Sequence, residues 1–374
     1  MSFPKKLTTK LLQRKENNSL RSLGKEINLV DFSSNDYLGL AKSEIVFNNV
    51  HQFLVAQNIK QNGATGSRLL SGNHKLYPLV EKQLAEFHNS ESALIFNSGY
   101  DANIGFFSSV PQRGDIILYD EFIHASIRDG IQLSNAKAYK FKHNDLLDLE
   151  EKIIRLNDSN NNNEIYVITE SVFSMDGDSP NLKEIVQICK TNKAYLIIDE
   201  AHAIGVFNKG LVETTEIHND IFARIVTFGK ALGCHGAAII SSEELKNYLV
   251  NFSRSFIYTT GLSPHAVATI SFAYKELPKS KEQLQKNILF FIKETQRLNL
   301  NFIKSESAIH CCIIPGNEKV KLIAQKLQEK GFDVKPILSP TVNKGEERLR
   351  FCLHSYNSFE EITSVLENLA TFAL

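Results

Sequence analysis

The sequence lacks the features of secreted, membrane and nucleic-acid-binding proteins. Its five cysteines show no CxxC spacing and are too few for a disulfide scaffold. The N-terminus has no apolar stretch like that of a signal peptide, and no apolar run approaches the roughly 20 residues that a membrane span needs. The 42 basic and 42 acidic residues cancel, which leaves no general electrostatic reason to bind nucleic acid or an anionic membrane. We therefore expect a cytoplasmic protein that binds no nucleic acid, membrane or metal.

The length of 374 residues exceeds that of one ordinary domain and favours two lobes. Apolar residues make up 43% and charged residues 22%, which is typical of a globular protein. Residues 1–24 are expected to form an amphipathic helix with Leu7, Leu11 and Leu12 on one side, and residues 27–32 a short strand. The predicted division is an N-terminal helix and strand arm at 1–45, a large domain at 46–270 and a small α+β domain at 271–374.

Six short apolar runs alternate with helical stretches between residues 45 and 270. They are 93–96, 115–119, 165–169, 194–199, 224–228 and 237–240. Several are apolar throughout, as in strands that are covered on both faces. This alternation predicts an α/β fold with a mostly parallel, doubly wound sheet. The polar tract 157–163 is typical of a solvated loop, and a long charged helix at 275–298 is expected to precede short strands and two further helices.

Polar residues stand at the carboxyl ends of these runs, which is where open parallel sheets bind ligands. In chain order, these residues are Ser98, Gly99, Tyr100, His124, Ser174, Asp199, His202, Thr227 and Lys230. A lysine, two histidines and acidic groups at neighbouring strand ends are what pyridoxal 5'-phosphate (PLP) chemistry requires.

Each of these groups has a chemical reason in a PLP site. PLP needs an amine for its Schiff base, and a lysine in cationic, desolvating surroundings suits that role. A carboxylate must face the pyridine nitrogen to keep it protonated, so that the ring serves as an electron sink. The phosphate needs backbone N–H groups at a helix N-terminus, and a flat aromatic side chain should cover the exposed ring face.

Ordinary structural explanations exist for each of these residues taken alone. A strand-end lysine is usually solvated, and Asp199 could cap a helix beside a surface histidine. Residues 124–126 could begin a helix, and residues 98–100 could form a common turn. The ordered pair of DEAH at 199–202 and TFGK at 227–230, each at the end of an apolar run, favours a functional site over these explanations.

With these motifs in place, the sequence resembles the α-oxoamine synthases, which are PLP enzymes of fold type I, along nearly its whole length. The shared stretches are FSSNDYLGL (32–40), GSRLLSGN (66–73), FNSGYDAN (96–103), HAS (124–126), TESVFSMDGD (169–178), DEAHAIGV (199–206), TFGKALG (227–233) and SPTV…RLRFCL (339–353). The resemblance implies an aspartate-aminotransferase-like fold and a homodimer with shared active sites. Thr260 and the loop at 66–68 are the candidates for reaching the partner's site.

The resemblance also implies roles for the strand-end residues. Lys230 binds PLP and moves the α-proton of the amino acid. Asp199 pairs with the pyridinium nitrogen, His202 contacts the ring oxygen and His124 stacks on the ring; these four are the expected catalytic residues. The further cofactor contacts that it implies are Gly99, Tyr100, Ser174, Thr227 and Thr260.

Substrate contacts are implied for Arg350, which would bind the amino-acid carboxylate with help from Asn35 and His124, and for Arg21 and Thr341. The nearest likeness is to the branch that joins L-alanine to a pimeloyl thioester, on coenzyme A or acyl-carrier protein, in making biotin. Other branches, which use glycine or serine with other thioesters, stay open as alternatives. A non-catalytic subunit of the same fold is an alternative of another class.

Overall fold

The computed structural model describes residues 3–24, 28–157 and 163–373, with the backbone alone at 278–280. The chain divides into two compact units. The large unit comprises Asn35–Ser174 and Asp178–Lys281, and the small unit comprises Met1–Ser34, Met175–Gly177 and Glu282–Leu374. The long helix α11 (Pro264–Arg297) gives its first part to the large unit and its last part to the small one. The domain division predicted from the sequence stays a prediction.

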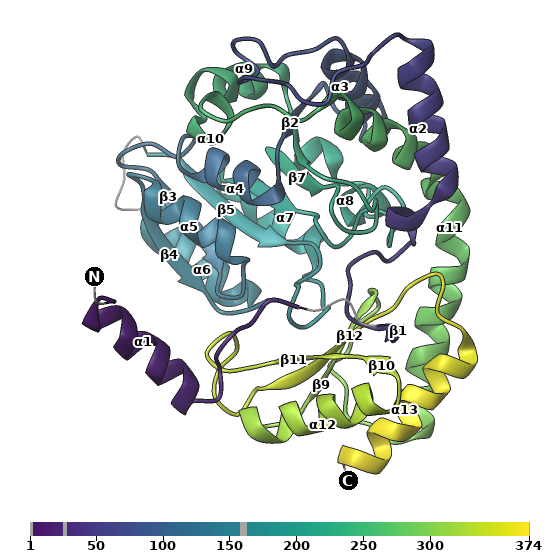
Figure 1. The fold of residues 1–374 in the computed structure, drawn as a ribbon. Coiled ribbons are helices and arrows are strands. Elements are labelled where there is room, and N and C mark those ends of the chain that lie inside the picture. The colour runs from purple at the N-terminus through teal and green to yellow at the C-terminus, as the bar shows by residue number, and fades with distance from the viewer. Residues whose placement is uncertain (1–2, 25–27, 158–162, 374) are drawn as a thin grey trace. The chain divides into compact units, whose positions relative to one another are not determined.

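A seven-stranded sheet forms the centre of the large unit (Figure 1). In spatial order its strands are β2 (Ser92–Phe96), β8 (Ala237–Ser241), β7 (Ala223–Thr227), β6 (Tyr195–Asp199), β5 (Ile165–Glu170), β3 (Ile116–Asp120) and β4 (Lys137–Phe141). Strand β8 runs antiparallel to both of its neighbours, and the other pairs are parallel. All six apolar runs are strands of this sheet, so the predicted α/β fold with a mostly parallel sheet is confirmed. Strand β4 was not predicted.

Both faces of the sheet are buried by helices, as the continuously apolar runs indicated. Within β6, for example, Ile197 packs into one core while Leu196 and Ile198 pack into the other. The first core is completed by α4 (Gly99–Phe107), α5 (Ala125–Leu133), α9 (Glu243–Phe252) and α10 (Arg254–Ile257). The second is completed by α6 (Leu146–Asn157), α7 (Leu182–Thr191) and α8 (Leu211–Thr214). The large unit also contains η1 (Leu40–Lys42), α2 (Glu44–Ala56), α3 (Leu76–Phe87) and η2 (His218–Asp220).

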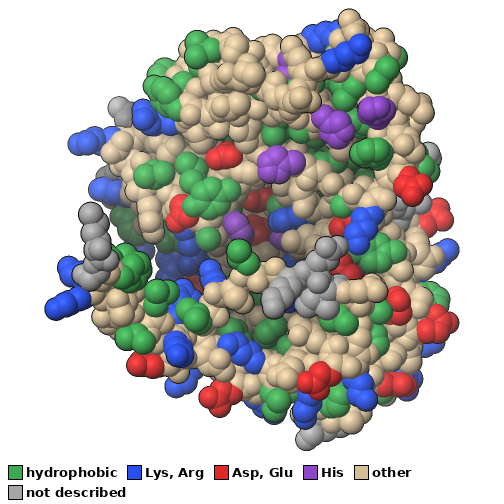
Figure 2. All heavy atoms as spheres, in the orientation of Figure 1, with side chains coloured by type: hydrophobic (Ala, Val, Ile, Leu, Met, Phe, Trp, Pro, Cys, Tyr) green, Lys and Arg blue, Asp and Glu red, His purple; other side chains and the backbone are tan. Residues whose placement is uncertain are grey.

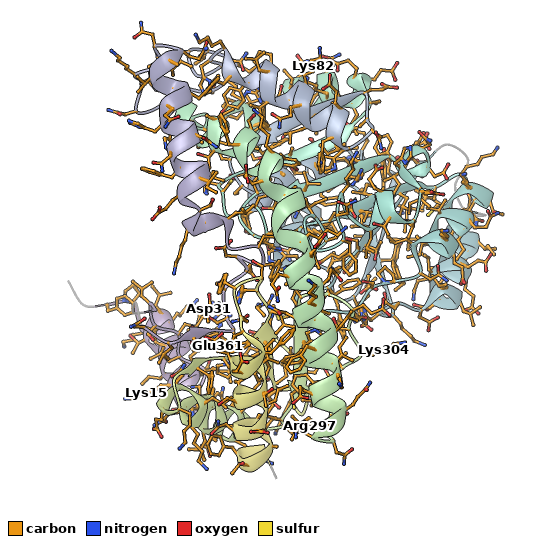
Figure 3. All side chains as sticks on the ribbon, turned by 90° about the vertical axis from the view of Figure 1, so that its right-hand side faces the viewer. Lys15, Asp31, Lys82, Arg297, Lys304 and Glu361 are labelled. Atoms are coloured by element: carbon orange, nitrogen blue, oxygen red, sulfur yellow. The ribbon has the colours of Figure 1, made fainter. Side chains whose placement is uncertain are left out.

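The small unit is built on a three-stranded antiparallel sheet and two helices. The sheet order is β11 (Lys335–Ile337), β12 (Arg348–Cys352) and β9 (Ile309–Ile313), and the helices are α12 (Asn317–Glu329) and α13 (Phe359–Ala373). Strand β1 (Val30–Asp31) pairs in parallel with β10 (Phe332–Asp333). Arg297, labelled in Figure 3, lies at the end of α11. It forms ion pairs with Glu294 at 2.7 Å and with Glu367 of α13 at 2.9 Å. The two helices predicted to follow the long charged helix are α12 and α13, so that prediction is confirmed.

Several predicted element boundaries were wrong. The N-terminal helix α1 (Lys5–Glu16) ends well before residue 24, because Asn17 closes it and Asn18 takes a left-handed backbone with φ 49°. The expected strand at 27–32 is only two residues long. Helix α11 begins at Pro264 rather than near 275, because the apolar residues ahead of its charged part continue the helix into the large unit.

The surface and the helices give two further observations. Figure 2 shows acidic and basic side chains interspersed over the visible face, which matches the zero net charge of the sequence. Within the part of the chain that the structure describes, no helix is both long and apolar enough to cross a membrane. The tract predicted as a solvated loop lies largely outside the described residues, at positions 158–162.

Candidate active site

The parallel strands bring their carboxyl ends to one edge of the sheet. Because β8 is antiparallel to both β2 and β7, these two strands point the same way, and β6, β5 and β3 share that direction. The turn after β2 therefore shares an edge with the residues that follow β3, β5, β6 and β7. Open parallel sheets bind ligands at this edge.

Lys230 lies in the turn that follows β7 and contacts a buried histidine. Its Nζ is 2.6 Å from Nε2 of His202, a residue in the turn that follows β6. His202 is 4% exposed, and its Nδ1 is 2.7 Å from the hydroxyl of the fully buried Tyr37. Tyr37 in turn donates a hydrogen bond to Oδ1 of Asn35 at 3.1 Å. The structure thus brings Lys230 and His202 together, as the strand-end positions predicted, and adds Tyr37, which the sequence reasoning missed.

Asp199 ends β6 and is held in place by two donors. Its carboxylate accepts hydrogen bonds from Nδ2 of Asn103 at 3.0 Å and from the backbone N–H of Ala201 at 2.9 Å. The side chain is 5% exposed, so the protein fixes its direction at the strand edge. A buried carboxylate anchored in this way is suited to face a protonated ring nitrogen. Asn103 belongs to the FNSGYDAN stretch, but no role had been predicted for it.

Asn103 also connects Asp199 with His124. The same Nδ2 lies 3.0 Å from Oγ of Ser126, and that hydroxyl lies 2.7 Å from Nδ1 of His124. His124 is the N-cap residue of α5, since its Nδ1 accepts from the N–H of Ser126 at 3.2 Å. The helix-start explanation therefore applies to this histidine, and its role in the active site stays a prediction. Burial and the nearby charge of Lys230 lower the pKa of His124. The lowered pKa favours the neutral imidazole, a flat ring that is suited to stacking.

A second carboxyl group, Glu170, lies beside Asp199. Strands β5 and β6 pair these two residues in register, and Glu170 accepts a hydrogen bond from the backbone N–H of His124 at 2.5 Å. Burial, together with the charge of Asp199, raises the pKa of Glu170 to about 8. Glu170 therefore keeps a proton near neutral pH, and the strand edge avoids two adjacent negative charges. The sequence reasoning gave no role to Glu170.

The turn after β2 offers backbone donors at the start of α4. Ser98 caps this helix: its Oγ accepts from the N–H of Asp101 at 3.0 Å, and its carbonyl accepts from the N–H of Ala102. The N–H groups of Gly99 and Tyr100 precede these bonds and have no carbonyl one helical turn earlier to pair with. A Cβ atom at Gly99 would meet Oγ1 of Thr227 at 3.5 Å, so the turn and the end of β7 are neighbours. This arrangement fits a phosphate group, and we call the turn at residues 98–100 the phosphate turn.

Two other predicted contacts also lie in the large unit. The carbonyl of Thr260 accepts a hydrogen bond at 2.6 Å from Asn97, which immediately precedes the phosphate turn. Ser174 follows β5 and is half-buried. In the 66–68 loop, the guanidinium of Arg68 is bound within its own chain, to Glu81 at 2.6 Å.

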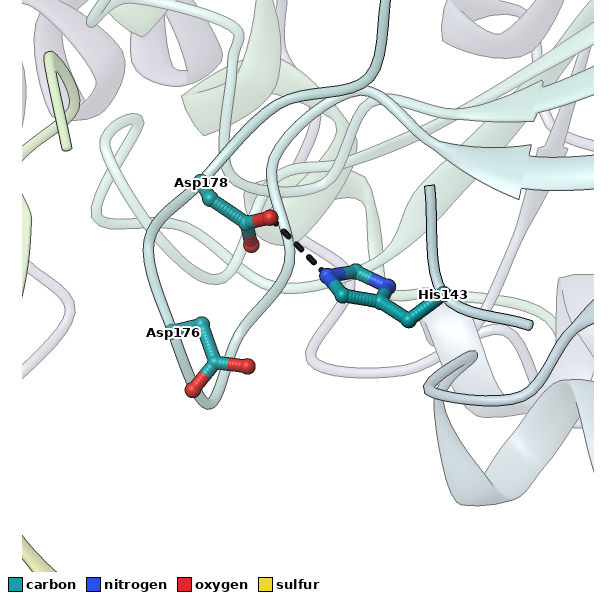
Figure 4. Close-up of side chains that lie close together, drawn as sticks. All are labelled: His143, Asp176 and Asp178. Carbon is teal, nitrogen blue, oxygen red and sulfur yellow. Dashed lines mark hydrogen bonds and ion pairs between the residues drawn. The ribbon is translucent and has the colours of Figure 1, made fainter. Parts of the chain in front are cut away.

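His143 forms an ion-pair bridge between two carboxylate groups. Its Nδ1 is 2.9 Å from Asp120 at the end of β3, and its Nε2 is 2.9 Å from Asp178 (Figure 4). Burial alone would lower the pKa of His143, but the hydrogen bonds and charges of the two carboxylates outweigh it and raise the pKa to about 9. The imidazolium therefore ties the segment that carries His124 to the one that follows β5. The sequence reasoning gave no role to His143.

The other predicted substrate contacts lie in the small unit. Nη2 of Arg21 is 3.5 Å from Oγ1 of Thr341, so the structure brings together two residues that are far apart in the sequence. Arg350 is half-buried in the middle of β12, opposite Cys311 of β9 and Lys335 of β11.

The adjacent Arg348 has a structural role. It is 4% exposed and forms an ion pair with Asp176, and its Nη1 donates to the carbonyl of Met175 at 3.2 Å. Of the two arginines on this strand, Arg350 is therefore the better candidate for a substrate contact.

Together, the fold and the groups at the strand edge define a PLP-dependent enzyme of the aspartate-aminotransferase-like type. An amine, an anchored carboxylate, a flat imidazole and a helix N-terminus meet each chemical need of that cofactor. Comparison with known proteins then gives the family. The model for aminotransferase class I and II matches residues 27–369. The chain belongs to this family and, within it, to the α-oxoamine synthases.

Three known proteins illustrate the likeness. The chain is 40% identical over 368 residues to an 8-amino-7-oxononanoate synthase of Emericella nidulans, covering 92% of this chain and 89% of that protein. A crystal structure of 8-amino-7-oxononanoate synthase from Francisella tularensis is 29% identical, with a TM-score of 0.76 and coverage of 92% and 97%. A serine palmitoyltransferase from S. paucimobilis, solved with a bound PLP–myriocin aldimine, is 25% identical, with a TM-score of 0.89 and coverage of 98% and 96%. These findings confirm the predicted fold, family and cofactor.

Proposed function

We propose that this protein joins L-alanine to a pimeloyl thioester with loss of carbon dioxide, as an 8-amino-7-oxononanoate synthase. The observation that carries the proposal is the Lys230 amine, held 2.6 Å from His202 on the strand edge that also bears the anchored Asp199. The choice of substrates rests on the 40% identical relative that bears this name. The reaction forms a carbon–carbon bond at the α-carbon of alanine, releases the thiol, and breaks the bond from the α-carbon to its carboxyl group.

The chain's own residues would divide the work between holding and proton transfer. PLP, when bound, supplies an electron sink for the charge that develops at the α-carbon. Asp199 would keep the ring nitrogen protonated, and the N–H groups of Gly99 and Tyr100 would hold the phosphate with Thr227. Lys230 would take the proton from the α-carbon at its Nζ and return a proton to the same carbon before product release.

The most direct test of this assignment is chemical labelling. Reduction of the purified, cofactor-loaded protein with borohydride, followed by peptide mapping, should place a pyridoxyl group on Lys230. Label on another lysine would overturn the assignment of the site. Activity should be highest with L-alanine and a pimeloyl thioester on coenzyme A or acyl-carrier protein. A preference for glycine with acetyl-CoA, or for serine with palmitoyl-CoA, would move the protein to another branch of the family.

Arg350 and Arg21 would act on different substrates. A guanidinium binds a carboxylate through two charge-assisted hydrogen bonds, worth about 1.5–3 kcal/mol each. Arg350, with Asn35 and His124, would bind the carboxylate of alanine, while Arg21 and Thr341 would contact the acyl donor. Arg350→Ala should raise the KM for alanine at least tenfold. Arg21→Ala should impair only the acyl substrate, and equal effects of both changes on the two substrates would contradict this division.

We further propose that the protein acts in the cytoplasm as a homodimer whose active sites are shared. Support for sharing comes from the resemblance to the α-oxoamine synthases, which implies that Thr260 reaches the active site of the partner. A Lys230→Ala chain and an inactive Thr260 variant, each without activity alone, should regain part of the activity when mixed. A fully active monomer in sedimentation would contradict the proposal.

A further inference from the structure

An irregular segment of the large unit, residues 259–262, lies beside the phosphate turn. It connects α10 with α11 and belongs to neither helix. Its second half is anchored by the chain that precedes β2. The N–H of Gly261 donates to the carbonyl of Gly66 at 3.0 Å, and the N–H of Leu262 donates to the hydroxyl of Tyr77 at 2.7 Å. The first half of the segment has a different anchor.

The amide group of Asn97 holds this first half. Asn97 directly precedes the phosphate turn, and its Nδ2 donates to Oγ1 of Thr259 at 3.0 Å and to the carbonyl of Thr260 at 2.6 Å. A backbone carbonyl can only accept, so the amide must present its nitrogen to Thr260. Within the described part of the chain, these two bonds are the only hydrogen bonds of Thr259 and Thr260.

Asn97 is itself fixed from both sides, whereas the two threonines are not. The preceding Phe96 pairs with Ala237 in the central sheet, and the hydroxyl of the following Ser98 caps α4. Of the two threonines, the first is half-buried and the second is exposed, so packing does little to place them. Control therefore runs from the side chain of Asn97 to the irregular segment.

We infer that Asn97 is a positioning residue for the cofactor phosphate, because its amide holds Thr259 and Thr260 at the phosphate turn. A hydroxyl that accepts from Asn97 still has its own hydrogen to give to a phosphate oxygen. A group that is already held in place loses less conformational freedom when the phosphate binds. The inference rests on the proposed place of the phosphate, and not on the proposed substrates. In the proposed homodimer every site carries the same anchor, so a change at Asn97 reaches the phosphate of each site.

The test compares the binding of PLP with that of pyridoxal, which lacks the phosphate, to full-length protein freed of cofactor. Equilibrium dialysis gives both dissociation constants. Asn97→Ala removes both hydrogen bonds and should weaken PLP binding by about tenfold, while pyridoxal binding changes by less than about twofold. A general loss of structure would weaken both ligands alike, so the ratio of the two constants isolates the phosphate.

A second variant leaves Asn97 in place. Thr259→Val keeps the shape of the side chain, removes Oγ1 and should weaken PLP binding by about threefold. The double variant should bind PLP within about twofold of Asn97→Ala alone, because both changes disrupt the same arrangement. Separate effects that multiply in the double variant would show that the two residues act independently, and would overturn the inference.

Gln83→Ala is the matched control. The amide of Gln83 donates to the carbonyl of Ser271 at 3.1 Å and accepts from its hydroxyl, so it forms a similar bridge between α3 and α11. This control should keep the wild-type ratio of PLP affinity to pyridoxal affinity. The inference is wrong if that ratio is unchanged in Asn97→Ala or changes equally in the control.

The wild type separates this inference from the proposed function. Equal affinity of the wild type for PLP and pyridoxal would show that the turn holds no phosphate, and the role of Asn97 would be refuted with it. A protein that fails to use alanine or pimeloyl thioesters would disprove the proposed function alone. The affinities are measured without substrate, so they would still decide the role of Asn97.

Discussion

Replacing His143 should change how the stability of the protein depends on pH. In the folded chain its imidazolium lies between Asp120 and Asp178, and its pKa is about 9 rather than the ordinary 6.5. At about 1.4 kcal/mol per pH unit, this difference corresponds to about 3 kcal/mol. The side chain is 17% exposed, so solvent screens the pair only in part.

The sign follows from the raised pKa. The folded protein holds a proton that the unfolded chain releases near pH 6.5, so the contribution is complete below pH 6.5 and is lost as the pH rises through about 9. His143→Gln keeps a hydrogen-bonding side chain but has no charge to lose. Between pH 6 and pH 9.5, the wild type should therefore lose about 3 kcal/mol more of its free energy of unfolding than the variant does.

Urea unfolding at the two pH values measures this difference, with the exposed His265→Gln as a control for removal of a surface histidine. In the wild type, the ring-proton resonance of His143 should titrate with a midpoint near 9. A midpoint at or below 6.5, or the same loss of stability in wild type and His143→Gln, would refute the ion-pair bridge as a source of stability.

Three further changes test the site and its supports. Asp199→Asn should lower turnover by orders of magnitude while PLP stays bound, and near-normal kinetics would show that this carboxylate does not face the ring. Arg224→Ala should lower the free energy of unfolding by about 3–5 kcal/mol in a denaturant titration, because it leaves the buried Glu200 without its 2.5 Å partner. Gly233→Ala should cost about 2 kcal/mol or more in the same titration, because φ is +59° and the new Cβ would meet the backbone of Ala41 at 2.1 Å. A change below 0.5 kcal/mol in either titration would contradict these packing arguments.

The central sheet was predictable from the sequence because its strands are buried on both faces. Burial on two sides requires continuous apolar runs, and such runs are visible without a structure. Strand β4 was missed for the opposite reason. It lies at the edge of the sheet with the sequence KAYKF, and both of its lysines are exposed, as is common for edge strands. Short polar edge strands have no sequence signal that separates them from loops.

The site was predictable only where a residue stands at the end of a recognisable run. Lys230 and Asp199 occupy such positions, and strand direction alone brings them to one edge. Tyr37, Asn103 and Glu170 act through neighbours that are far away in the sequence, and their contacts appear only after the chain folds. The FSSNDYLGL, FNSGYDAN and TESVFSMDGD stretches contained all three, but a shared stretch does not show which side chain supports which.

The antiparallel strand β8 also affects the order in which the parts of the large unit can fold during synthesis. Among the described residues, the sheet partner of β2 is β8 alone. Strand β8 leaves the ribosome about 140 residues after β2, or roughly 7–30 s later at ordinary rates of synthesis. During that interval the apolar segment SALIF has an unpaired edge. The phosphate turn that follows it also reaches the sheet edge beside Lys230 only after β8 is in place. The unpaired strand is therefore prone to aggregation during synthesis, and PLP can stabilise the fold only after most of the large unit has been synthesised.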